Sequence, residues 1–390
     1  MFGHRLLKMA AWPGERRFAA GRENLEHVQR DKLALLLRKV AACEVGQRRG
    51  VAADWQWETF AERVPVSDYG DWRDPVDRAR ESGGNALIQS PVVRYQPTSG
   101  STSAIKWIPY TRQFLSELDS AISPWIVDLY RQFPRLSGGR HYWSMSWVPT
   151  SLRDNMREDI NDDIQLMSMG KRLLAGATQA VPQDVSLART SEDSLFATLA
   201  YLVSDDSLAM MSIWSPTFGL GLLKSMALWR EELAEVLASG SWGQRMKGSH
   251  TECCPRSPRA AALLRQWDGR LSADFFMTLW PSLALVSAWD TAASSPWARQ
   301  LHGLLPQAAF QGKGLWATEG VVTIPYQGQY ALAYRSHVYE FQDPSDGTIY
   351  APWELEQGQE VMPLLSTGSG LLRYRLKDLV RVDGLPGGIP

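Results

Sequence analysis

The sequence predicts an α/β fold. In the middle of the chain, a helical pattern over 192–205 precedes the apolar run 208–214, and a second helical pattern follows over 219–238. Strands that alternate with helices form sheets covered by helices, so this order favours α/β over α+β. The chain has 390 residues, of which 44% are hydrophobic and 21% are charged. That composition is globular, and the length allows one large domain or more than one.

Further elements are expected on both sides of this region. We expect residues 1–22 to be loosely ordered. Apolar side chains with helical spacing predict helices over 23–43, 111–133 and 290–303. Strand candidates are apolar runs or stretches that alternate in polarity. They are 92–95, 141–149, 276–286, 329–341, 359–366 and, with the alternation of an exposed strand, 371–382.

The overall charge and the cysteines restrict the functional class. The net charge of −1 gives no reason to expect a nucleic acid or an anionic membrane as a partner. No apolar run approaches the ~20 residues that span a bilayer. The three cysteines, Cys43, Cys253 and Cys254, cannot form a disulfide framework, which favours a reducing cytoplasm. His250 beside the two adjacent cysteines lacks the ligand spacing of a zinc site.

The most informative stretch is the hydroxyl-rich loop within residues 95–111, YQPTSGSTSAIKWIPYT. Gly100 lets the backbone approach a ligand closely, and Lys106 adds a positive charge. The hydroxyls and backbone N–H groups of such a loop can surround phosphate oxygens, as an anion-binding nest does. The loop residues are Thr98, Ser99, Gly100, Ser101, Thr102 and Ser103. The loop therefore suits a polyphosphate, and the alternative is an ordinary Ser/Thr-rich surface turn.

The loop is not a Walker A motif, which requires G-x-x-x-x-G-K-[ST]. It resembles the first motif of the acyl-acid amido synthetases, the adenylate-forming family of plant auxin- and jasmonate-conjugating enzymes and their bacterial relatives. Residues 316–320, WATEG, resemble the second motif, and residues 372–382, LRYRLKDLVRV, resemble the third. Residues 64–69 and 339–341 resemble further landmarks of the family. Three motifs in the family's order argue against coincidence.

The resemblance implies a domain organisation. Residues 23–384 would form the family's large N-terminal domain, in which mixed sheets are flanked by helices in layered subdomains. Residues 385–390 would begin a linker to the family's small C-terminal domain, which would be absent from this sequence. That domain carries part of the acceptor site in the family. The first half-reaction is therefore the one that these residues would support by themselves.

The resemblance also implies roles for residues of the first two motifs. The loop over 98–103 would hold the β- and γ-phosphates of ATP, with Lys106 nearby. Thr318 would bond the α-phosphate. Glu319 would bind the Mg²⁺ that bridges phosphate oxygens, because Mg²⁺ sites commonly combine one or two carboxylates with substrate phosphates.

The third motif is expected to hold the rest of the nucleotide. Asp378 would accept hydrogen bonds from the ribose hydroxyls, while Tyr374 and Arg375 would support the nucleotide or the strand. The alternative for these residues is a surface role, in which the carboxylates of the motifs are solvated. Arg373, Arg375 and Arg381 would then form one solvated face of a strand.

The function that the resemblance implies is an ATP- and Mg²⁺-dependent ligase. A small-to-medium apolar or aromatic carboxylic acid would be activated as an acyl-adenylate, and an amine, in this family an amino acid, would then displace AMP to form an amide. No protein nucleophile is needed, which agrees with the lack of a G-x-S-x-G motif. The alternatives are a ligase that uses coenzyme A or a carrier protein, and a degenerate protein that binds nucleotide or acyl groups without turnover.

Large apolar residues are candidates for the acyl pocket, although ordinary core packing is the alternative for each. They are Trp125, Leu129, Trp143, Trp214 and Phe218. Two departures from the family's motifs favour the alternative of a degenerate protein that binds ligand without turnover. Ala104 and Lys377 stand where glycine is usual.

Overall fold

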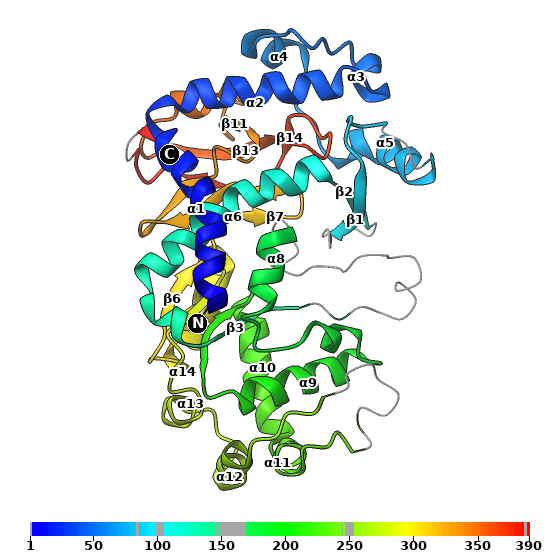
Figure 1. The fold of residues 1–390 in the computed structure, drawn as a ribbon. Helices are drawn as coiled ribbons and strands as arrows, with labels where there is room; N and C mark the ends of the chain where they lie inside the picture. Colours follow the sequence, from blue (N-terminus) through cyan, green and yellow to red (C-terminus); the bar gives the residue numbers. More distant parts are fainter. Residues whose placement is uncertain are drawn as a thin grey trace. The chain divides into compact units, whose positions relative to one another are not determined.

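The computed structural model describes residues 2–82, 86–98, 105–145, 147, 169–243, 245, 253–385 and 388–390. The chain divides into two compact units (Figure 1). Unit 1 consists of Met1–Ala10, Leu129–Gln165 and Met169–Lys313, and unit 2 of Ala11–Asp128, Leu166–Ser168 and Gly314–Pro390. Each unit has its own strands and hydrophobic core. No helix in the described ranges is both long and apolar enough to cross a membrane.

Unit 1 is built on a four-stranded parallel sheet with the order β3-β4-β5-β6. Its strands are β3 (Arg140–Trp143), β4 (Leu208–Ser212), β5 (Leu285–Ala288) and β6 (Ala309–Gly312). All residues of the two central strands, β4 and β5, are buried. Because the strands run in one direction, their carboxyl ends meet at one edge, where open α/β sheets bind ligands.

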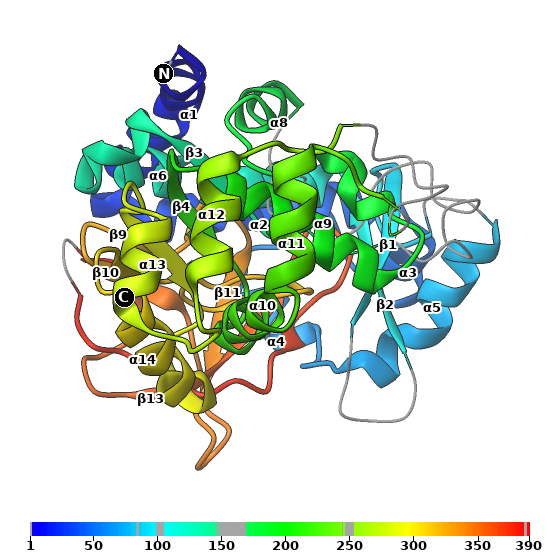
Figure 2. The same cartoon turned by 90° about the horizontal axis from the view of Figure 1, so that it is seen from below.

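Helices connect the strands of this sheet. They are α8 (Met169–Gly176), α9 (Ser191–Ser204), α10 (Pro216–Leu228), α11 (Arg230–Ser239), α12 (Pro258–Gln266), α13 (Ala273–Leu279) and α14 (Ser295–Leu304). A hydroxyl caps the amino end of four of them, from Thr190, Ser215, Ser257 and Ser272. Helices α11 and α12 lie side by side (Figure 2). The alternation predicted over 192–238 is confirmed, with a break between α10 and α11 at Trp229.

One strand prediction in unit 1 is wrong over its first half. The sequence predicts a strand over 276–286, whereas the chain forms the end of α13, a turn, and then β5. The Ser272 side chain accepts a hydrogen bond from the Phe275 N–H and starts the helix. Pro281 lies between the helix and the strand. A short apolar run fits a buried helix as well as a strand, so periodicity could not separate the two.

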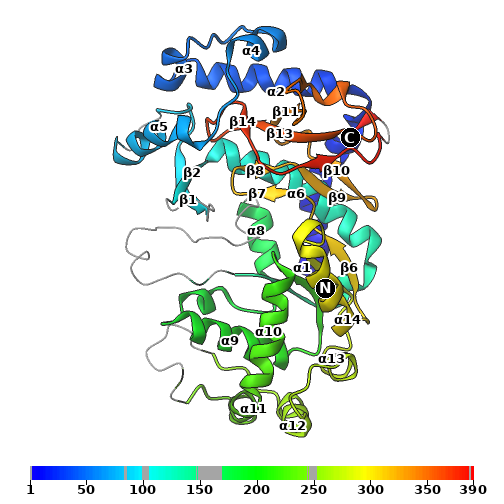
Figure 3. The ribbon, with the colours of Figure 1, turned by 180° about the vertical axis from the view of Figure 1, so that it is seen from behind.

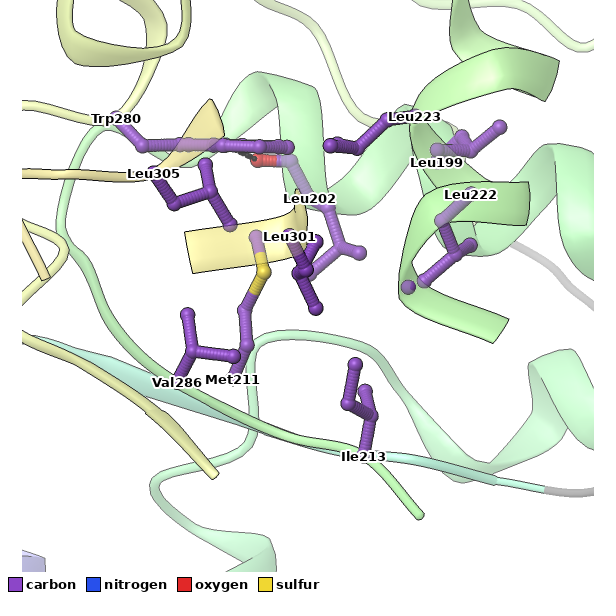
Figure 4. Close-up of a pocket in the computed structure, with 11 residues that line it drawn as sticks. Leu199, Leu202, Met211, Ile213, Leu222, Leu223, Trp280, Val286, Leu301 and Leu305 are labelled. Carbon is purple, nitrogen blue, oxygen red and sulfur yellow. Dashed lines mark hydrogen bonds between the residues drawn. The ribbon is translucent and has the colours of Figure 1, made fainter. Parts of the chain in front are cut away.

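A small cavity lies inside unit 1 between the sheet and its helices (Figure 4). Its volume is about 10 Å³, which is space for about one water molecule. The side chains that surround it are apolar and include Leu199, Leu222, Trp280 and Leu301. The cavity is therefore a gap in core packing and not a pocket for a substrate.

Unit 2 contains a hairpin and a larger antiparallel sheet. The hairpin pairs β1 (Val92–Thr98) with β2 (Lys106–Thr111). The sheet has the order β12-β11-β13-β14, and β15 also pairs with β13. Its strands are β11 (Val338–Gln342), β12 (Ile349–Tyr350), β13 (Glu360–Ser366), β14 (Tyr374–Arg375) and β15 (Val380–Arg381). Two further hairpins join β7 (Trp316–Ala317) to β8 (Gly320–Val321) and β9 (Thr323–Tyr326) to β10 (Gln329–Leu332).

Unit 2 also contains helices. They are α2 (Leu25–Val40), α3 (Glu44–Arg48), α4 (Trp57–Arg63), α5 (Tyr69–Ser82) and most of α6 (Arg112–Gln132). Of these, α2 contacts β11 and α5 contacts β2. Helix α2 lies along the sheet that contains β11 and β13 (Figure 3). The helices predicted over 23–43 and 111–133 are thus confirmed as α2 and α6.

Both ends of the described chain are more ordered than the sequence suggests. Helix α1 (Phe2–Ala20) replaces the loosely ordered N-terminus that was expected. Phe18 is fully buried in unit 2 and packs on the rings of Tyr326 and Tyr334. Packing against residues distant in sequence stabilises this helix, which local pattern alone does not reveal. Ile389 is buried and the Leu332 N–H donates to the Pro390 carbonyl at 2.9 Å, so residues 388–390 are packed rather than a free linker.

Candidate active site

The β1–β2 hairpin places the two ends of the hydroxyl-rich loop together. Thr98, the last residue of β1, lies opposite Lys106, the first residue of β2. Ser99, Gly100, Ser101, Thr102 and Ser103 connect these strands and lie outside the described residues. The hairpin register therefore fixes where the loop begins and ends, and brings Lys106 to its base.

The second motif forms a tight turn between β7 and β8, with Thr318 and Glu319 at its tip. Tyr110 of β2 donates a hydrogen bond from its hydroxyl to the Thr318 carbonyl at 3.1 Å. This bond ties the turn to the hairpin of the first motif. Tyr110 and Lys106 lie four residues apart on one strand, so they share a face of the hairpin.

Glu319 is buried, with 8% of its surface exposed, and the third motif holds its carboxylate. The Tyr374 hydroxyl donates to Glu319 Oε1 at 3.1 Å. Burial raises the pKa of Tyr374, as it does the pKa of Tyr110, and the neighbouring Glu319 charge adds to both shifts. Both phenols therefore stay protonated and keep their donor hydrogens. The three motifs thus meet in unit 2 around Glu319.

The third motif is not the exposed strand that the sequence predicts. Only β14 and β15 are paired, and Leu372, Arg373 and Tyr374 are buried. Asp378 lies exposed between the two short strands, outside the hydrogen-bonded group around Glu319. Arg375 Nη1 instead donates to Gln342 of β11 at 3.1 Å. Arg373 is buried in an ion pair, Arg375 is half-buried and Arg381 is exposed, so the three arginines do not form one solvated face.

That ion pair joins Arg373 to Glu340, whose side chains are each 4% exposed. Arg373 donates from Nε to Glu340 Oε2 at 2.8 Å and from Nη2 to Oε1 at 2.9 Å. Its Nη1 donates to the carbonyls of Ala61 and Val64, both at 2.6 Å. The alternative of a solvated arginine face is therefore wrong for Arg373. Arg373 also has a positive φ of 48°, a conformation uncommon in residues other than glycine.

The landmark at 64–69 is hydrogen-bonded to the same segment. The Ser67 N–H donates to the Arg373 carbonyl at 3.0 Å, and the Arg375 N–H donates to the Ser67 carbonyl at 2.9 Å. The Ser67 hydroxyl donates to the Leu372 carbonyl at 2.7 Å. Two landmarks, one containing Ser67 and one containing Glu340, thus fix the backbone that presents Tyr374 to Glu319.

Sequence reasoning missed two polar residues on β1. Arg94 and Gln96 are buried. Together with Thr98 they occupy every second position of β1, so the three side chains lie on one face of the strand. The Arg94 guanidinium lies 4.9 Å from the centre of the Tyr110 ring. Gln96 is 1% exposed, and neither end of its amide has a hydrogen-bond partner among the described residues. The sequence did contain a signal for them, because polar residues stand at every second position from Arg94 to Thr98, directly before the hydroxyl-rich loop.

The five candidates for the acyl pocket are divided between the two units. Trp125 belongs to unit 2, where its ring is 6.3 Å from Trp316. Trp143 is fully buried at the end of β3, whereas Phe218 on α10 is 38% exposed. Leu129, on the part of α6 that belongs to unit 1, is also fully buried. The assignment of these residues to an acyl pocket stays a prediction.

Trp214 is the candidate with the most informative surroundings. It follows β4 at the carboxyl edge of the parallel sheet. Its ring centre lies 4.5 Å from Lys313 Nζ and 5.8 Å from the Trp289 ring. Lys313 is buried and donates to the Ser212 hydroxyl at 2.8 Å. This edge therefore combines aromatic surface with a positive charge.

Known proteins with a similar fold were found among solved structures. The GH3.15 acyl acid amido synthetase has a TM-score of 0.79 and 18% identity, covering 96% of this chain and 69% of that one. A structure described as AtGH3.15 in complex with 2,4-DB has a TM-score of 0.75 and 18% identity, covering 94% and 67%. At this identity the likeness establishes the mixed α/β fold, as the sequence predicts.

Curated relatives and family models agree with the structural likeness. The indole-3-acetic acid-amido synthetase GH3.15 of Arabidopsis thaliana is 21% identical over 402 residues, covering 94% of this chain and 67% of that protein. The probable indole-3-acetic acid-amido synthetase GH3.12 of Oryza sativa subsp. japonica is 20% identical over 421 residues, covering 93% and 67%. The model of the GH3 family N-terminal domain matches residues 14–310, and that of the GH3 family central domain matches residues 330–390. The chain therefore belongs to the GH3 family.

Proposed function

We propose that the protein activates a carboxylic acid with ATP as an acyl-adenylate and transfers the acyl group to an amine. The observation that carries this proposal is the meeting of three motifs at Glu319, with Tyr110 on the Thr318 carbonyl and Tyr374 on the carboxylate. The relatives named as indole-3-acetic acid-amido synthetases and acyl acid amido synthetases support the same reaction class.

The proposed reaction has two steps. A carboxylate oxygen of the acid attacks the α-phosphorus of ATP, and the bond from that phosphorus to the bridging oxygen breaks, releasing pyrophosphate. The amine nitrogen then attacks the acyl carbon, the bond from that carbon to the AMP oxygen breaks, and the nitrogen loses a proton. Both reactants of the first step are anions, so positive charge and fixed geometry must lower its barrier.

Residues of unit 2 have the properties that these roles need. Lys106 stands at the base of the loop and would place its charge beside the ATP phosphates. Glu319 would hold Mg²⁺ on the phosphates, and its donor set fits, because a carboxylate is the hard oxygen ligand that Mg²⁺ favours. Tyr374 uses Oε1 of Glu319 as an acceptor, which leaves Oε2 for the ion. Mg²⁺ would supply charge neutralisation on the phosphate oxygens.

The carboxylates among the described residues are consistent with this arrangement. No group of three or more His, Cys, Asp or Glu side chains in the described ranges is placed to hold a metal by itself. Among those residues Glu319 would be a single carboxylate ligand, and Mg²⁺ sites that bind nucleotides commonly add phosphate oxygens and water to one or two carboxylates.

The acid is proposed to be small to medium in size and apolar or aromatic. Trp214 at the carboxyl edge of the sheet provides aromatic surface, and a relative's structure is described with 2,4-DB bound. A cytoplasmic location is also proposed, since Cys43, Cys253 and Cys254 are free thiols.

The experiment that tests the proposal is carboxylate-dependent exchange of labelled pyrophosphate into ATP, measured over a panel of aryl and aliphatic acids. Exchange that depends on one acid class and on Mg²⁺, and that disappears in Glu319→Gln, is the expected result. Addition of amino acids should then give an amide product by mass spectrometry, whereas a product only with coenzyme A would identify a thioester ligase. Measurable ATP binding without exchange for any acid would overturn the proposal.

A further inference from the structure

The turn that carries Glu319 has a third anchor besides Tyr110 and Tyr374. The Val321 N–H donates to Nε2 of His337 at 3.2 Å. His337 is fully buried just before β11. Because Nε2 accepts this bond, the proton of the neutral imidazole must be on Nδ1. Nδ1 in turn lies 2.8 Å from Glu117 Oε2 and donates to it.

Glu117 connects this histidine to the turn that precedes the third motif. It lies on α6 and is buried, with 6% of its surface exposed. Its Oε2 also accepts from the Gly368 N–H at 2.8 Å, and its Oε1 accepts from Gln113 Nε2 at 3.1 Å. The Ser336 hydroxyl donates to the Glu117 carbonyl at 2.9 Å. One carboxylate thus holds the imidazole and the backbone of residue 368 together.

The geometry around the pair leaves little freedom for either group. The His337 ring stacks on Phe114, with ring centres 5.4 Å apart and planes 16° apart. A Cβ at Gly320 would lie 2.9 Å from His337 Nε2, and a Cβ at Gly368 would lie 2.7 Å from the Phe114 nitrogen. Glycine at both positions therefore lets the backbone come close enough for the hydrogen bonds from the Val321 N–H to His337 and from the Gly368 N–H to Glu117.

We propose that Glu117 and His337 are positioning residues: they fix the position of the turn that carries Glu319 relative to the segment that carries Tyr374. Neither residue contacts a reacting atom in this scheme. His337 holds the backbone two residues after Glu319, and Glu117 holds the backbone six residues before Tyr374. The inference rests on the proposed role of Glu319 as the ligand of Mg²⁺ on ATP. Loss of the pair should displace the Glu319 carboxylate and weaken use of Mg²⁺ while leaving the acid site intact.

The electrostatics agree with a fixed tautomer. Burial lowers the pKa of His337, which keeps the imidazole neutral and its Nε2 lone pair available to Val321. Burial disfavours the Glu117 carboxylate, but hydrogen bonds from His337 and Gly368 and the charge of Lys32 hold its pKa below the usual range. A neutral ring beside an ionised carboxylate is the state in which all these donors and acceptors are matched.

The test is the Mg²⁺ concentration that half-saturates pyrophosphate exchange at fixed ATP and saturating acid. His337→Phe keeps a ring of similar size but removes both hydrogen bonds. It should raise that concentration about tenfold or more, with the KM for the acid unchanged within twofold. Glu117→Gln keeps the shape but offers one accepting oxygen in place of two, so it should give a smaller increase. His337→Gln can accept from Val321 and should recover part of the loss.

The matched control is His4→Phe. His4 is also buried with both ring nitrogens bonded, to the Tyr130 hydroxyl and the Gly139 carbonyl, but it belongs to unit 1. This control should lose stability and keep the wild-type Mg²⁺ dependence. Equal Mg²⁺ dependence in His337→Phe, Glu117→Gln and the control would overturn the inference while the proposed function stands.

Absence of exchange in the wild type would instead count against the proposed function. The same variants would then be compared for Mg²⁺-dependent ATP binding by calorimetry. Weaker Mg²⁺-dependent binding in His337→Phe than in His4→Phe would support the positioning role, and equal binding would refute it.

Discussion

Removal of Arg373 should be among the most destabilising single changes in unit 2. Arg373→Met leaves the Glu340 carboxylate buried without its partner and leaves the carbonyls of Ala61 and Val64 without the donor Nη1. Breaking a buried pair from one side costs about 3–5 kcal/mol of unfolding free energy. With an m-value of ~3 kcal/mol/M, the urea midpoint should fall by roughly 1–2 M.

An exposed arginine on the same motif provides the control. Arg381 Nε lies 3.1 Å from Asp383 Oδ1, with side chains 66% and 80% exposed. Arg381→Met removes an ion pair of similar length in solvent, so its cost should be about 0–1 kcal/mol. Both variants are measured by urea unfolding followed by tryptophan fluorescence, with the wild type alongside.

A double-mutant cycle separates the pair from its surroundings. Glu340→Leu combined with Arg373→Met removes both charges, so the double variant should be destabilised by much less than the sum of the two single variants. The reasoning would be refuted if Arg373→Met shifted the midpoint no more than Arg381→Met, or if the two single effects were additive.

Three further predictions concern the site and the stability of unit 1. Tyr374→Phe removes the donor to Glu319 Oε1 and should lower Mg²⁺-dependent pyrophosphate exchange about tenfold with an unchanged fold by circular dichroism; wild-type exchange would exclude the contact from function. Asp378→Ala should raise the Kd for ATP in calorimetry if this exposed carboxylate binds the ribose, and an unchanged Kd would remove it from the site. Burial, with the nearby His4 charge, lowers the pKa of His141 from 6.5 to about 3. The unfolded chain therefore takes up a proton that the folded chain does not, and the free energy of unfolding should decrease as pH falls from about 6.5 toward 3, by at most ~1.4 kcal/mol per pH unit. The urea midpoint of His141→Phe should depend less on pH over this window, and identical slopes would contradict the assignment.

Local patterns predicted much of the fold. The helices α2 and α6 and the run α9, β4, α10 follow from the spacing of apolar residues, because each buries one face against a core. Prediction was wrong where the pattern was short. Phe276 and its apolar neighbours fit a helix or a strand equally well, and α1 depends on rings contributed by Tyr326 and Tyr334. Secondary structure in such segments is decided by distant partners.

The sequence by itself determined the three motifs, their order and the family they resemble, because motif residues lie close together along the chain. Tertiary structure alone decided which of them meet. Glu319 and Tyr374 are 55 residues apart, Glu117 and His337 are 220 apart, and no local pattern records such pairs. The same holds for Arg373. The alternation of charged and apolar residues around it predicts an exposed side chain, whereas in the folded chain it is buried and paired with Glu340. Burial and pairing are properties of contacts between distant segments, so they exist only once the chain has folded.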